Sequence, residues 1–255
     1  MQIRFDIKIA ERYHSASQKS RVFTEAWVDN EAFCPNCGSS LSQFQKGRPV
    51  ADFYCPKCRE EYELKSKKDS IGMKIVDGAY RTMLERLRSD NNPNLFLLNY
   101  DLRSFEIQNF FVVPKHFFVP EIIEQRKPLS ETARRSGWVG CNILLKDIPL
   151  VGKIFYIKKG KVESREQILE NWRKTLFLRE EKEVAAKGWI LDIMNCIDKI
   201  GKGEFSLNEV YAFEKQLEQK HPNNRHIKDK IRQQLQFLRD KGYLDFITRG
   251  KYRLS

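Results

Sequence analysis

The sequence has no apolar run that approaches the length of a membrane span, and it has no internal repeat and no low-complexity tract. The lack of an apolar span argues against a membrane-embedded protein, and the hydrophobic and aromatic content of the chain argues against a disordered one. The first segment, MQIRFDIKIAERYH, is charged every few residues, which argues against a secretory signal. We therefore expect a cytoplasmic protein. Its 255 residues, 41% hydrophobic and 12% aromatic, are enough for a sizeable core and for two domains.

Acidic residues are in the minority. The chain has 34 Asp and Glu against 46 Lys and Arg, which gives a net charge of +12. Such an excess favours polyanionic partners, first among them nucleic acid. On charge alone, the alternative is a basic surface that serves only solubility.

Four of the six cysteines form two CxxC pairs, which are separated by the seventeen residues Gly38–Tyr54. In a reducing compartment, pairs at this spacing indicate a metal site and not disulfides. Four thiolates give a closed tetrahedral site that suits structural Zn²⁺. The alternative is four core cysteines without metal. The predicted zinc ligands are Cys34, Cys37, Cys55 and Cys58, and the two single cysteines, Cys141 and Cys196, are interpreted as buried thiols.

The first part of the chain, residues 1–181, predicts an α/β fold with a mixed sheet flanked by helices. Hydrophobic spacing indicates helices and strands in alternating groups. The expected helices are Ser17–Val28, with Ser17 as N-cap, and Met73–Ser89, ended by DNNP; the expected strands lie near Ala51–Tyr54, Glu61–Lys65, Asn94–Tyr100 and Ile107–Pro114. Strand and loop are expected over residues 137–157.

The last part, residues 182–255, has a different pattern, and the charged stretch 158–184 contains the predicted domain boundary. A helix is expected over Trp189–Ile200. A second begins at Ser206, where Glu209 completes a capping box, and a third covers His226–Lys241. The final residues predict a hairpin that turns at residues 248–250. Three helices followed by a hairpin are typical of a winged helix-turn-helix domain.

Residues Ala51–Lys68, ADFYCPKCREEYELKSKK, also contain a possible catalytic set. Glu63 and Lys65 lie on the same face of a strand because they are two residues apart. Asp52 can reach that face from the adjoining strand. Two carboxylates can bind a hard divalent ion, and an ammonium beside them can orient water and stabilise an attacked phosphate. The alternative is a solvated strand edge, in a chain with 31% charged residues.

Several segments resemble known nucleases. CPNCG, RPVADFYC, ELKSKK, DGAY, SDNNPN, RKPL, TARRSGWVGCNI, MNCIDKI, HIKDKIRQQLQFLRDKG and RGKYR occur in this order. Together they are similar to the PD-(D/E)xK nucleases and, more closely, to the DpnI-like methyl-directed restriction endonucleases. The resemblance covers essentially the whole chain. One departure from the superfamily pattern is that Pro49 does not directly precede Asp52.

The resemblance implies that Asp52, Glu63 and Lys65 are catalytic and that the four paired cysteines bind zinc. It further implies a Mg²⁺-dependent endonuclease that cuts double-stranded DNA at GATC sites containing N6-methyladenine. Asp52 and Glu63 would hold the Mg²⁺, with the Leu64 carbonyl as a third ligand. Because a zinc knuckle would close the connection between the strands of Asp52 and Glu63, we expect the zinc to brace them. The alternative function is a non-catalytic, zinc-containing winged-helix DNA-binding regulator.

The expected third helix in the last part has one apolar and one polar face. Its core face is formed by Ile227, Ile231, Leu235 and Leu238. The opposite face would enter the major groove, and the hairpin would contact phosphates. The predicted DNA contacts are Arg225, Asp229, Arg232, Gln233 and Gln236 from the helix region, and Arg249, Lys251 and Arg253 from the hairpin. The alternative is a solvated face in a protein–protein module.

A second candidate DNA surface is the segment TARRSGWVG, Thr132–Gly140. Arg134 and Arg135 beside a glycine suit a loop that touches DNA. Trp138 could equally belong to the core. The resemblance implies that Trp138 helps to sense the methyl group, and that the winged helix also prefers methylated DNA.

Overall fold

The computed structural model describes residues 1–45, 51–89, 92–181 and 183–255. These residues form two compact units, the first of Met1–Leu145 and Val151–Thr175, the second of Lys146–Leu150 and Leu176–Ser255. The expected domain boundary lies between Glu181 and Lys182. Lys182 is outside the described residues, so this boundary stays a prediction. No helix in the described ranges has both the length and the apolar content needed to cross a bilayer.

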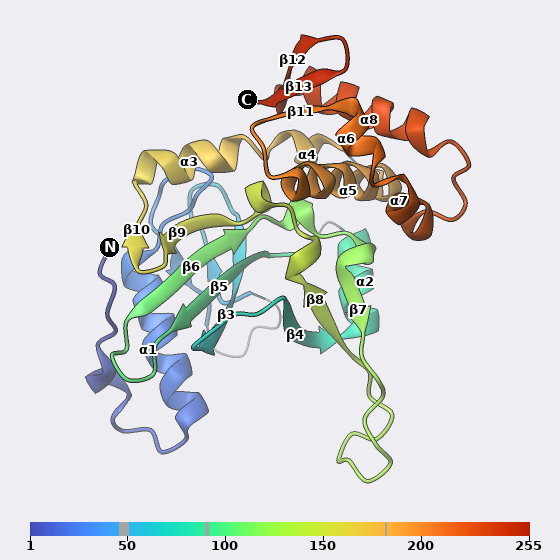
Figure 1. Ribbon diagram of the computed structural model, residues 1–255. Helices are drawn as coiled ribbons and strands as arrows, with labels where there is room; N and C mark the ends of the chain where they lie inside the picture. The colour runs from blue at the N-terminus through green and yellow to red at the C-terminus, as the bar shows by residue number, and fades with distance from the viewer. Residues whose placement is uncertain (46–50, 90–91, 182) are drawn as a thin grey trace. The chain divides into compact units, whose positions relative to one another are not determined.

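A seven-stranded mixed sheet forms the centre of the first unit (Figure 1). The central strand β5 has every residue of NLFLLNY buried, as expected for a strand covered on both faces. Strand β3 is parallel to β5, and the other neighbouring pairs are antiparallel. In spatial order the strands are β1 (Ser42–Gln43), β2 (Phe53–Tyr54), β3 (Glu61–Lys68), β5 (Asn94–Tyr100), β6 (Ile107–Val113), β9 (Ile154–Lys158) and β10 (Lys161–Val162).

Helix α1, Ala16–Glu31, packs on this sheet through aromatic side chains. Phe23 lies edge-on to Tyr100, with ring centroids 5.4 Å apart, and Trp27 lies edge-on to Phe110 at 5.2 Å. The helix was expected here, but the predicted N-cap is wrong. Ser15 has the extended backbone of the N-cap, so Ser17 already lies in the first helical turn.

The expected helix Met73–Ser89 is wrong in its first half. Residues Lys74–Ala79 form strand β4, and only Tyr80–Arg88 form a helix, α2. Strand β4 pairs with β8 (Gly140–Leu144), which pairs with β7 (Ile123–Gln125), and these form a second, three-stranded antiparallel sheet. The partner of β4 is far away in the sequence, so local hydrophobic spacing does not reveal the pairing. Of the expected DNNP stop, Asp90 and Asn91 lie outside the described residues.

The rest of the first unit consists of short helical segments and α3. Strand and short helix alternate over residues 137–157, in agreement with the expected strand and loop. Ser164 caps α3 by accepting a hydrogen bond from the Gln167 amide. The segments are the 3-10 helices η1 (Ile7–Ala10), η2 (Lys115–Phe117), η3 (Pro120–Ile122), η4 (Leu145–Asp147, which ends in the second unit) and η5 (Leu150–Gly152), and helix α3 (Arg165–Arg173).

The second unit has the expected helices followed by a hairpin. The predicted capping box of Ser206 and Glu209 is confirmed, with the Ser206 amide 2.8 Å from the Glu209 carboxylate. The helix that starts there ends early, and a second one begins at Glu214. The elements are α4 (Phe177–Glu180), α5 (Val184–Ile200), β11 (Glu204–Ser206), α6 (Leu207–Tyr211), α7 (Glu214–Lys220), α8 (Ile227–Asp240), β12 (Leu244–Thr248) and β13 (Lys251–Leu254).

Helix α8 provides much of the core of this unit. Its four predicted core residues, Ile227, Ile231, Leu235 and Leu238, are all buried. Strands β12 and β13 form the predicted hairpin around Arg249 and Gly250, and β11 adds a third strand beside β13. Gly250 has a φ of 75°, a left-handed conformation that glycine adopts without a steric penalty.

A buried carboxylate connects two helices of the second unit. Asp192 on α5 is 8% exposed and accepts hydrogen bonds from Lys220 Nζ at 2.5 Å and His221 Nε2 at 2.8 Å. The His221 ring stacks on Trp189 with centroids 3.7 Å apart. Burial by itself raises the pKa of Asp192, but the hydrogen bond from His221 and the charge of Lys220 outweigh it, and the pKa lies below its usual value.

We expect Asp192→Asn to destabilise the second unit by about 1.5–3 kcal/mol at neutral pH, as for hydrogen bonds to a charged group. Because the folded-state pKa is lowered, the contribution of Asp192 is present above the unfolded pKa of about 3.9. It is lost as the pH falls through the folded pKa. Hydrogen exchange of the α5 amides should therefore show a gap between variant and wild type at pH 6 that narrows as the pH falls below about 3.9. Glu218→Gln, at an exposed position of α7, is the matched control.

Candidate active site and metal centre

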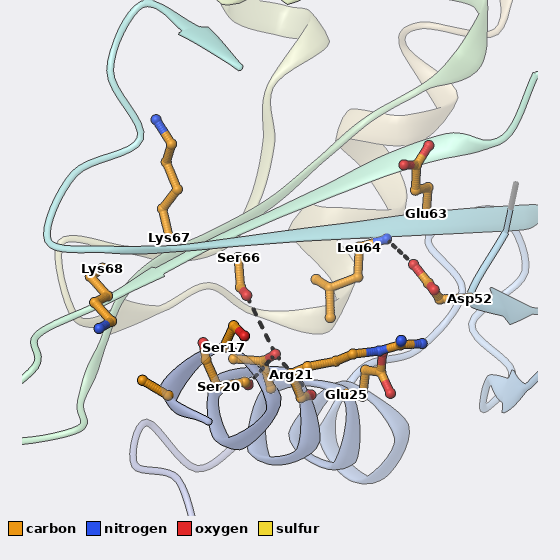
Figure 2. A pocket seen from close by; sticks show the side chains of 12 residues that line it. Ser17, Ser20, Arg21, Glu25, Asp52, Glu63, Leu64, Ser66, Lys67 and Lys68 are labelled. Carbon is orange, nitrogen blue, oxygen red and sulfur yellow. Dashed lines mark hydrogen bonds and ion pairs between the residues drawn. The ribbon is translucent and has the colours of Figure 1, made fainter. Parts of the chain in front are cut away.

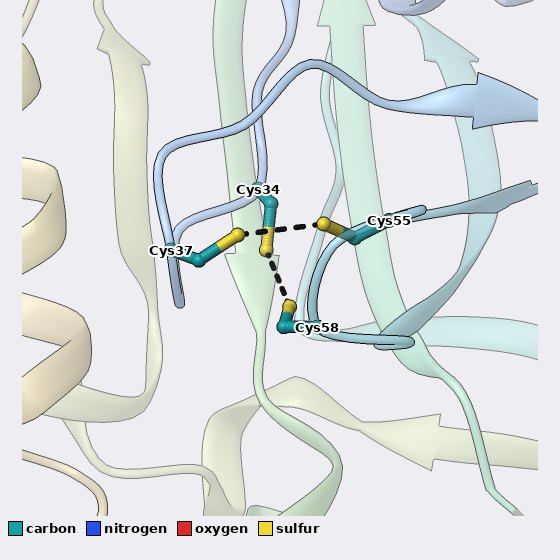
Figure 3. Close-up of side chains that lie close together, drawn as sticks. All are labelled: Cys34, Cys37, Cys55 and Cys58. Atoms are coloured by element: carbon teal, nitrogen blue, oxygen red, sulfur yellow. Dashed lines mark hydrogen bonds between the residues drawn. The ribbon is translucent and has the colours of Figure 1, made fainter.

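The four paired cysteines converge on one point (Figure 3). Their Sγ atoms all lie within 4.8 Å of one another, and the Cys34–Cys58 and Cys37–Cys55 distances are both 3.4 Å. Zinc–sulfur bonds of about 2.3 Å in a tetrahedron place the sulfurs roughly 3.8 Å apart. The cluster therefore fits a zinc ion, and it has a complete set of four protein ligands.

The two CPxC segments fold in the same way. In each, the residue after the second cysteine donates its amide to the carbonyl of the first: Gly38 to Cys34 at 2.8 Å and Arg59 to Cys55 at 2.9 Å. Gly38 and Arg59 both have left-handed backbones, with φ of 78° and 61°. These backbone hydrogen bonds close both turns, and each turn carries two of the four sulfurs.

Side chains from elsewhere in the first unit hold the cluster in place. The Tyr62 hydroxyl lies 3.1 Å from Cys34 Sγ, and the Trp172 indole on α3 donates to Asn36 Oδ1 at 3.0 Å. Burial raises the pKa of Cys37, but the amide and hydroxyl of Ser39 outweigh it and lower the pKa to about 6. This thiol is thus inclined towards the thiolate form that metals bind.

The second knuckle is also the connection of a hairpin. Strand β2 leads into Cys55–Cys58 and β3 leaves it, with Phe53 paired to Tyr62 and Tyr54 to Glu61. The Asp52 amide, just before β2, donates to the Tyr62 carbonyl at 2.9 Å. The cysteine cluster therefore lies at one end of the hairpin, and Asp52 and Glu63 lie at the other.

Asp52 lies at an open edge of β3 (Figure 2). Strand β2 begins at Phe53, so beyond Tyr62 this edge of β3 has no strand partner from β2. The Asp52 carboxylate takes this place and accepts a hydrogen bond from the Leu64 amide at 2.7 Å. The amide and carbonyl of one strand residue point to the same edge, so the Leu64 carbonyl also faces the side of Asp52.

Glu63 and Lys65 lie on one face of β3, as their spacing predicts. Lys65 Nζ is 2.8 Å from Glu63 Oε1, and Leu64 leaves the strand on the other side (Figure 2). Burial raises the pKa of Glu63, and the positive charge of Lys65 only partly offsets this. Burial lowers the pKa of Lys65, but the Glu63 and Asp77 carboxylates outweigh it and keep the amine protonated.

Asp77 is the residue at this site that the sequence interpretation missed. Its Oδ1 lies 2.8 Å from Lys65 Nζ, so the lysine bridges two carboxylates. Asp77 belongs to β4, which the sequence interpretation placed in a helix. The DGAY segment, which includes Asp77, is part of the family resemblance, and a glycine within a strand is also a signal of a bulge or of a close approach of the backbone.

A pocket of about 900 Å³ opens between α1 and β3. Asp52, Glu63 and Leu64 line one end of it, and Lys68 lies further along the strand. Its α1 side is polar. The residues there include Ser17, Ser20, Arg21, Thr24 and Glu25. Oxygen donors at an accessible pocket are the environment that a hard cation with water and phosphate ligands requires.

The predicted loop residues lie between β7 and β8, in a segment that extends away from the sheets (Figure 1). Arg134 and Arg135 are exposed, and Trp138 is partly exposed, so Trp138 is not a core residue. The Arg135 guanidinium lies 4.8 Å from the centre of the Trp138 ring. The ring packs over Gly140, where an added Cβ would lie only 2.8 Å from it.

The polar residues predicted to face away from the core of the second unit are exposed. Those near or on α8 are Arg225, Asp229, Arg232, Gln233 and Gln236, and those of the hairpin are Arg249, Lys251 and Arg253. Arg232 pairs with Asp229 and donates to the Tyr211 hydroxyl at 3.0 Å. Gln233 accepts a hydrogen bond from Lys230 at 2.8 Å. These partners would have to exchange for bases on binding DNA.

Comparison with known families agrees with both parts of the chain. The model of the Dam-replacing family, DpnI, matches residues 1–181. The chain belongs to the DpnI family. A second model, the Dam-replacing helix-turn-helix domain, matches residues 185–254. Membership of the DpnI family indicates a methylation-dependent restriction endonuclease, and the helix-turn-helix domain implies DNA binding. The resemblance to the DpnI-like endonucleases seen in the sequence is confirmed.

We expect Cys55→Ser to lose bound zinc and to destabilise the first unit, because the free energy of metal binding is partly folding free energy. A loss of about 3 kcal/mol would lower the unfolding midpoint by roughly 6–12 °C. Elemental analysis and thermal unfolding of the purified protein measure both effects. Cys196→Ser, which changes a cysteine outside the cluster, should keep its zinc. Purified wild-type protein without zinc would contradict the structural-zinc assignment.

Proposed function

We propose that this chain is a Mg²⁺-dependent endonuclease that hydrolyses double-stranded DNA at GATC sites containing N6-methyladenine. The observation that carries the proposal is the convergence of Asp52, Glu63 and Lys65 at the open end of the β2–β3 hairpin. Residues 1–181 would form the catalytic domain, with a PD-(D/E)xK core, and residues 182–255 a winged helix that reads DNA. Pro49, which bears on the superfamily motif, lies outside the described residues. A cytoplasmic location fits this activity.

The metal would bind at the edge of β3. Asp52 and Glu63 offer carboxylate oxygens, and the Leu64 carbonyl faces the same edge as its amide, which Asp52 already contacts at 2.7 Å. This donor set consists only of oxygen, which suits Mg²⁺ and leaves positions for water and phosphate. When bound, Mg²⁺ polarises the scissile phosphate and makes its bound water more acidic.

Lys65 would act on the attacking water. Its ammonium is held at the site by two carboxylates at 2.8 Å, so its position does not depend on substrate. A fixed positive charge there orients water towards phosphorus and stabilises the negative charge that develops on the phosphate. A pure DNA-binding protein would not need this set, which is why we favour an enzyme over a regulator.

Two separate surfaces would read the methyl group. Burying one methyl group gains only about 0.8 kcal/mol, or roughly fourfold in affinity. Strong dependence on methylation therefore needs either a penalty when the methyl group is missing or two readings in series. We assign this task to two surfaces. One is the segment Thr132–Gly140 of the first unit, called the Trp138 loop below, and the other is the polar face of α8 together with the β12–β13 hairpin. The excess of Lys and Arg, 46 against 34 acidic residues, suits both.

We expect wild-type protein with Mg²⁺ to cut a plasmid methylated at GATC and to leave a matched unmethylated plasmid intact. Lys65→Ala should abolish cleavage and leave specific binding nearly unchanged, because it removes a group needed at the transition state and not one that holds the duplex. Digestion and gel-shift assays on the same preparation measure both.

Lys161→Ala, an exposed lysine on β10 at the far edge of the sheet, is the charge-matched control and should cut normally. Cleavage by Lys65→Ala at near wild-type rate would remove Lys65 from the mechanism. Binding to methylated DNA without any cutting by wild type would favour the non-catalytic regulator.

A fragment of residues 182–255 should fold and bind DNA without cutting it. Its affinity should fall steeply as salt rises, because phosphate contacts release counterions, and it should prefer methylated over unmethylated GATC. Titrating both duplexes measures this. The complementary fragment 1–181 should cut less efficiently than the whole chain, because it lacks the second binding site.

Equal affinity of the 182–255 fragment for the two duplexes would leave methyl sensing to the Trp138 loop alone. Failure to bind either duplex would refute the assignment of Arg225, Arg232 and Gln233 to DNA and favour a protein-docking role.

A further inference from the structure

We propose that Asp77 is a positioning residue for the reaction: it holds the Lys65 ammonium in place when Glu63 turns to the metal. The inference rests on the proposed function, because Lys65 and Glu63 belong to the proposed catalytic set. The starting observation is that Lys65 Nζ lies 2.8 Å from both Glu63 Oε1 and Asp77 Oδ1.

The backbone at Asp77 is irregular in a way that serves this contact. Strand β4 pairs Asp77 with Cys141 and Ala79 with Gly140, so Gly78 is an extra residue that forms a β-bulge. Bulges bend a strand and change the direction of a side chain. The Gly78 amide, freed from the sheet, donates to Asp77 Oδ1 at 2.7 Å. The bulge therefore fixes the carboxylate as well as turning it.

The placement of Asp77 would be costly without a partner. It lies on the same side of β4 as the buried Ile75, and its side chain is only 12% exposed. A carboxylate in such a position needs a cation or hydrogen bonds to offset desolvation. Lys65 supplies the cation from another sheet, so the pair connects β3 to β4.

The two carboxylates on Lys65 have different tasks. Lys65 contacts one oxygen of Glu63, Oε1. A metal ion on the same carboxylate shares its single negative charge with the ammonium and repels it, so metal binding weakens the Glu63–Lys65 pair. If Glu63 were the only partner, the lysine would compete with the metal and then lose its anchor. With Asp77 present, Lys65 can release Glu63 and stay beside the water that it orients. Asp77 thus has two effects: it favours metal binding at Glu63, and it keeps Lys65 in position.

The first test is kinetic. Asp77→Ala should lower single-turnover cleavage at saturating DNA about 10- to 100-fold, the range expected when a reacting group is misplaced by about 1 Å. The DNA concentration for half-saturation should stay within about twofold. Asp77→Asn keeps an oxygen that can accept hydrogen bonds from Lys65 and from the Gly78 amide. Its cleavage rate should therefore lie between those of wild type and Asp77→Ala. Glu85→Ala, an exposed carboxylate on α2, is the charge-matched control.

The second test measures metal binding without activity, by calorimetric titration with Ca²⁺. In Asp77→Ala the Lys65 ammonium pairs with Glu63 alone and competes with the metal for it. Ca²⁺ should therefore bind about 5- to 10-fold more weakly than to wild type, which corresponds to about 1–1.4 kcal/mol of binding free energy. In the double variant Lys65→Ala, Asp77→Ala the competitor is gone, and affinity should return to that of Lys65→Ala. A merely structural role for Asp77 would instead weaken Ca²⁺ binding by the same factor whether or not Lys65 is present.

The outcomes separate this inference from the proposed function. Wild-type protein that binds methylated DNA but never cuts it would refute the function. Wild-type protein that cuts, together with an Asp77→Ala variant of unchanged rate and Ca²⁺ affinity, would refute only the role of Asp77. Additive effects of the two substitutions on Ca²⁺ affinity, with a lowered melting temperature of Asp77→Ala, would show that the residue serves the fold alone and would also overturn the inference.

Discussion

The short antiparallel pairing of β2 with β3 is the constraint on which the candidate site depends. It consists of only two residue pairs, and such a short hairpin has little stability by itself. The four-cysteine cluster closes one end of it, and the bond from the Leu64 amide to Asp52 closes the other. A zinc ion at the cluster would fix the connection between the strands and hence the distance between Asp52 and Glu63. We propose that this is why one pair of the cysteines, Cys55 and Cys58, lies in the same eighteen residues as Asp52, Glu63 and Lys65.

The central sheet supports this hairpin from the other side. Strand β3 is parallel to the fully buried β5 along seven residue pairs, from Tyr62 to Lys68. Tyr62 connects the two sites most directly: its hydroxyl lies beside Cys34, its ring stacks on Phe96, and its carbonyl accepts the Asp52 amide. A change at the cluster can therefore reach the carboxylates through one rigid side chain and its backbone.

Each charged group of the candidate site has a hydrogen-bonding or ionic partner within the protein. Lys65 lies between Glu63 and Asp77, and Asp52 is held by a backbone amide. Such an arrangement keeps carboxylates close together at a tolerable cost and leaves Asp52 and Glu63 accessible from the pocket. In the second unit, the buried Asp192 accepts hydrogen bonds from Lys220 and His221 and so joins the end of α7 to α5. Paired charges thus hold the proposed catalytic lysine in the first unit and connect two helices in the second.

The sequence by itself determined the features that rest on local spacing. The CxxC pairs, Glu63 and Lys65 on one face of a strand, the capping box at Ser206 and the core face of α8 all follow from contacts between residues close in the chain. Tertiary structure decided whatever depends on distant partners. The local sequence of β4 predicts a helix, but the segment forms a strand because it pairs with β8, more than sixty residues further along the chain. This pairing, with its bulge at Gly78, brings Asp77 to Lys65. Long-range pairing leaves little trace in local periodicity, because a strand at the edge of a small sheet is selected by its partner and not by its own propensity.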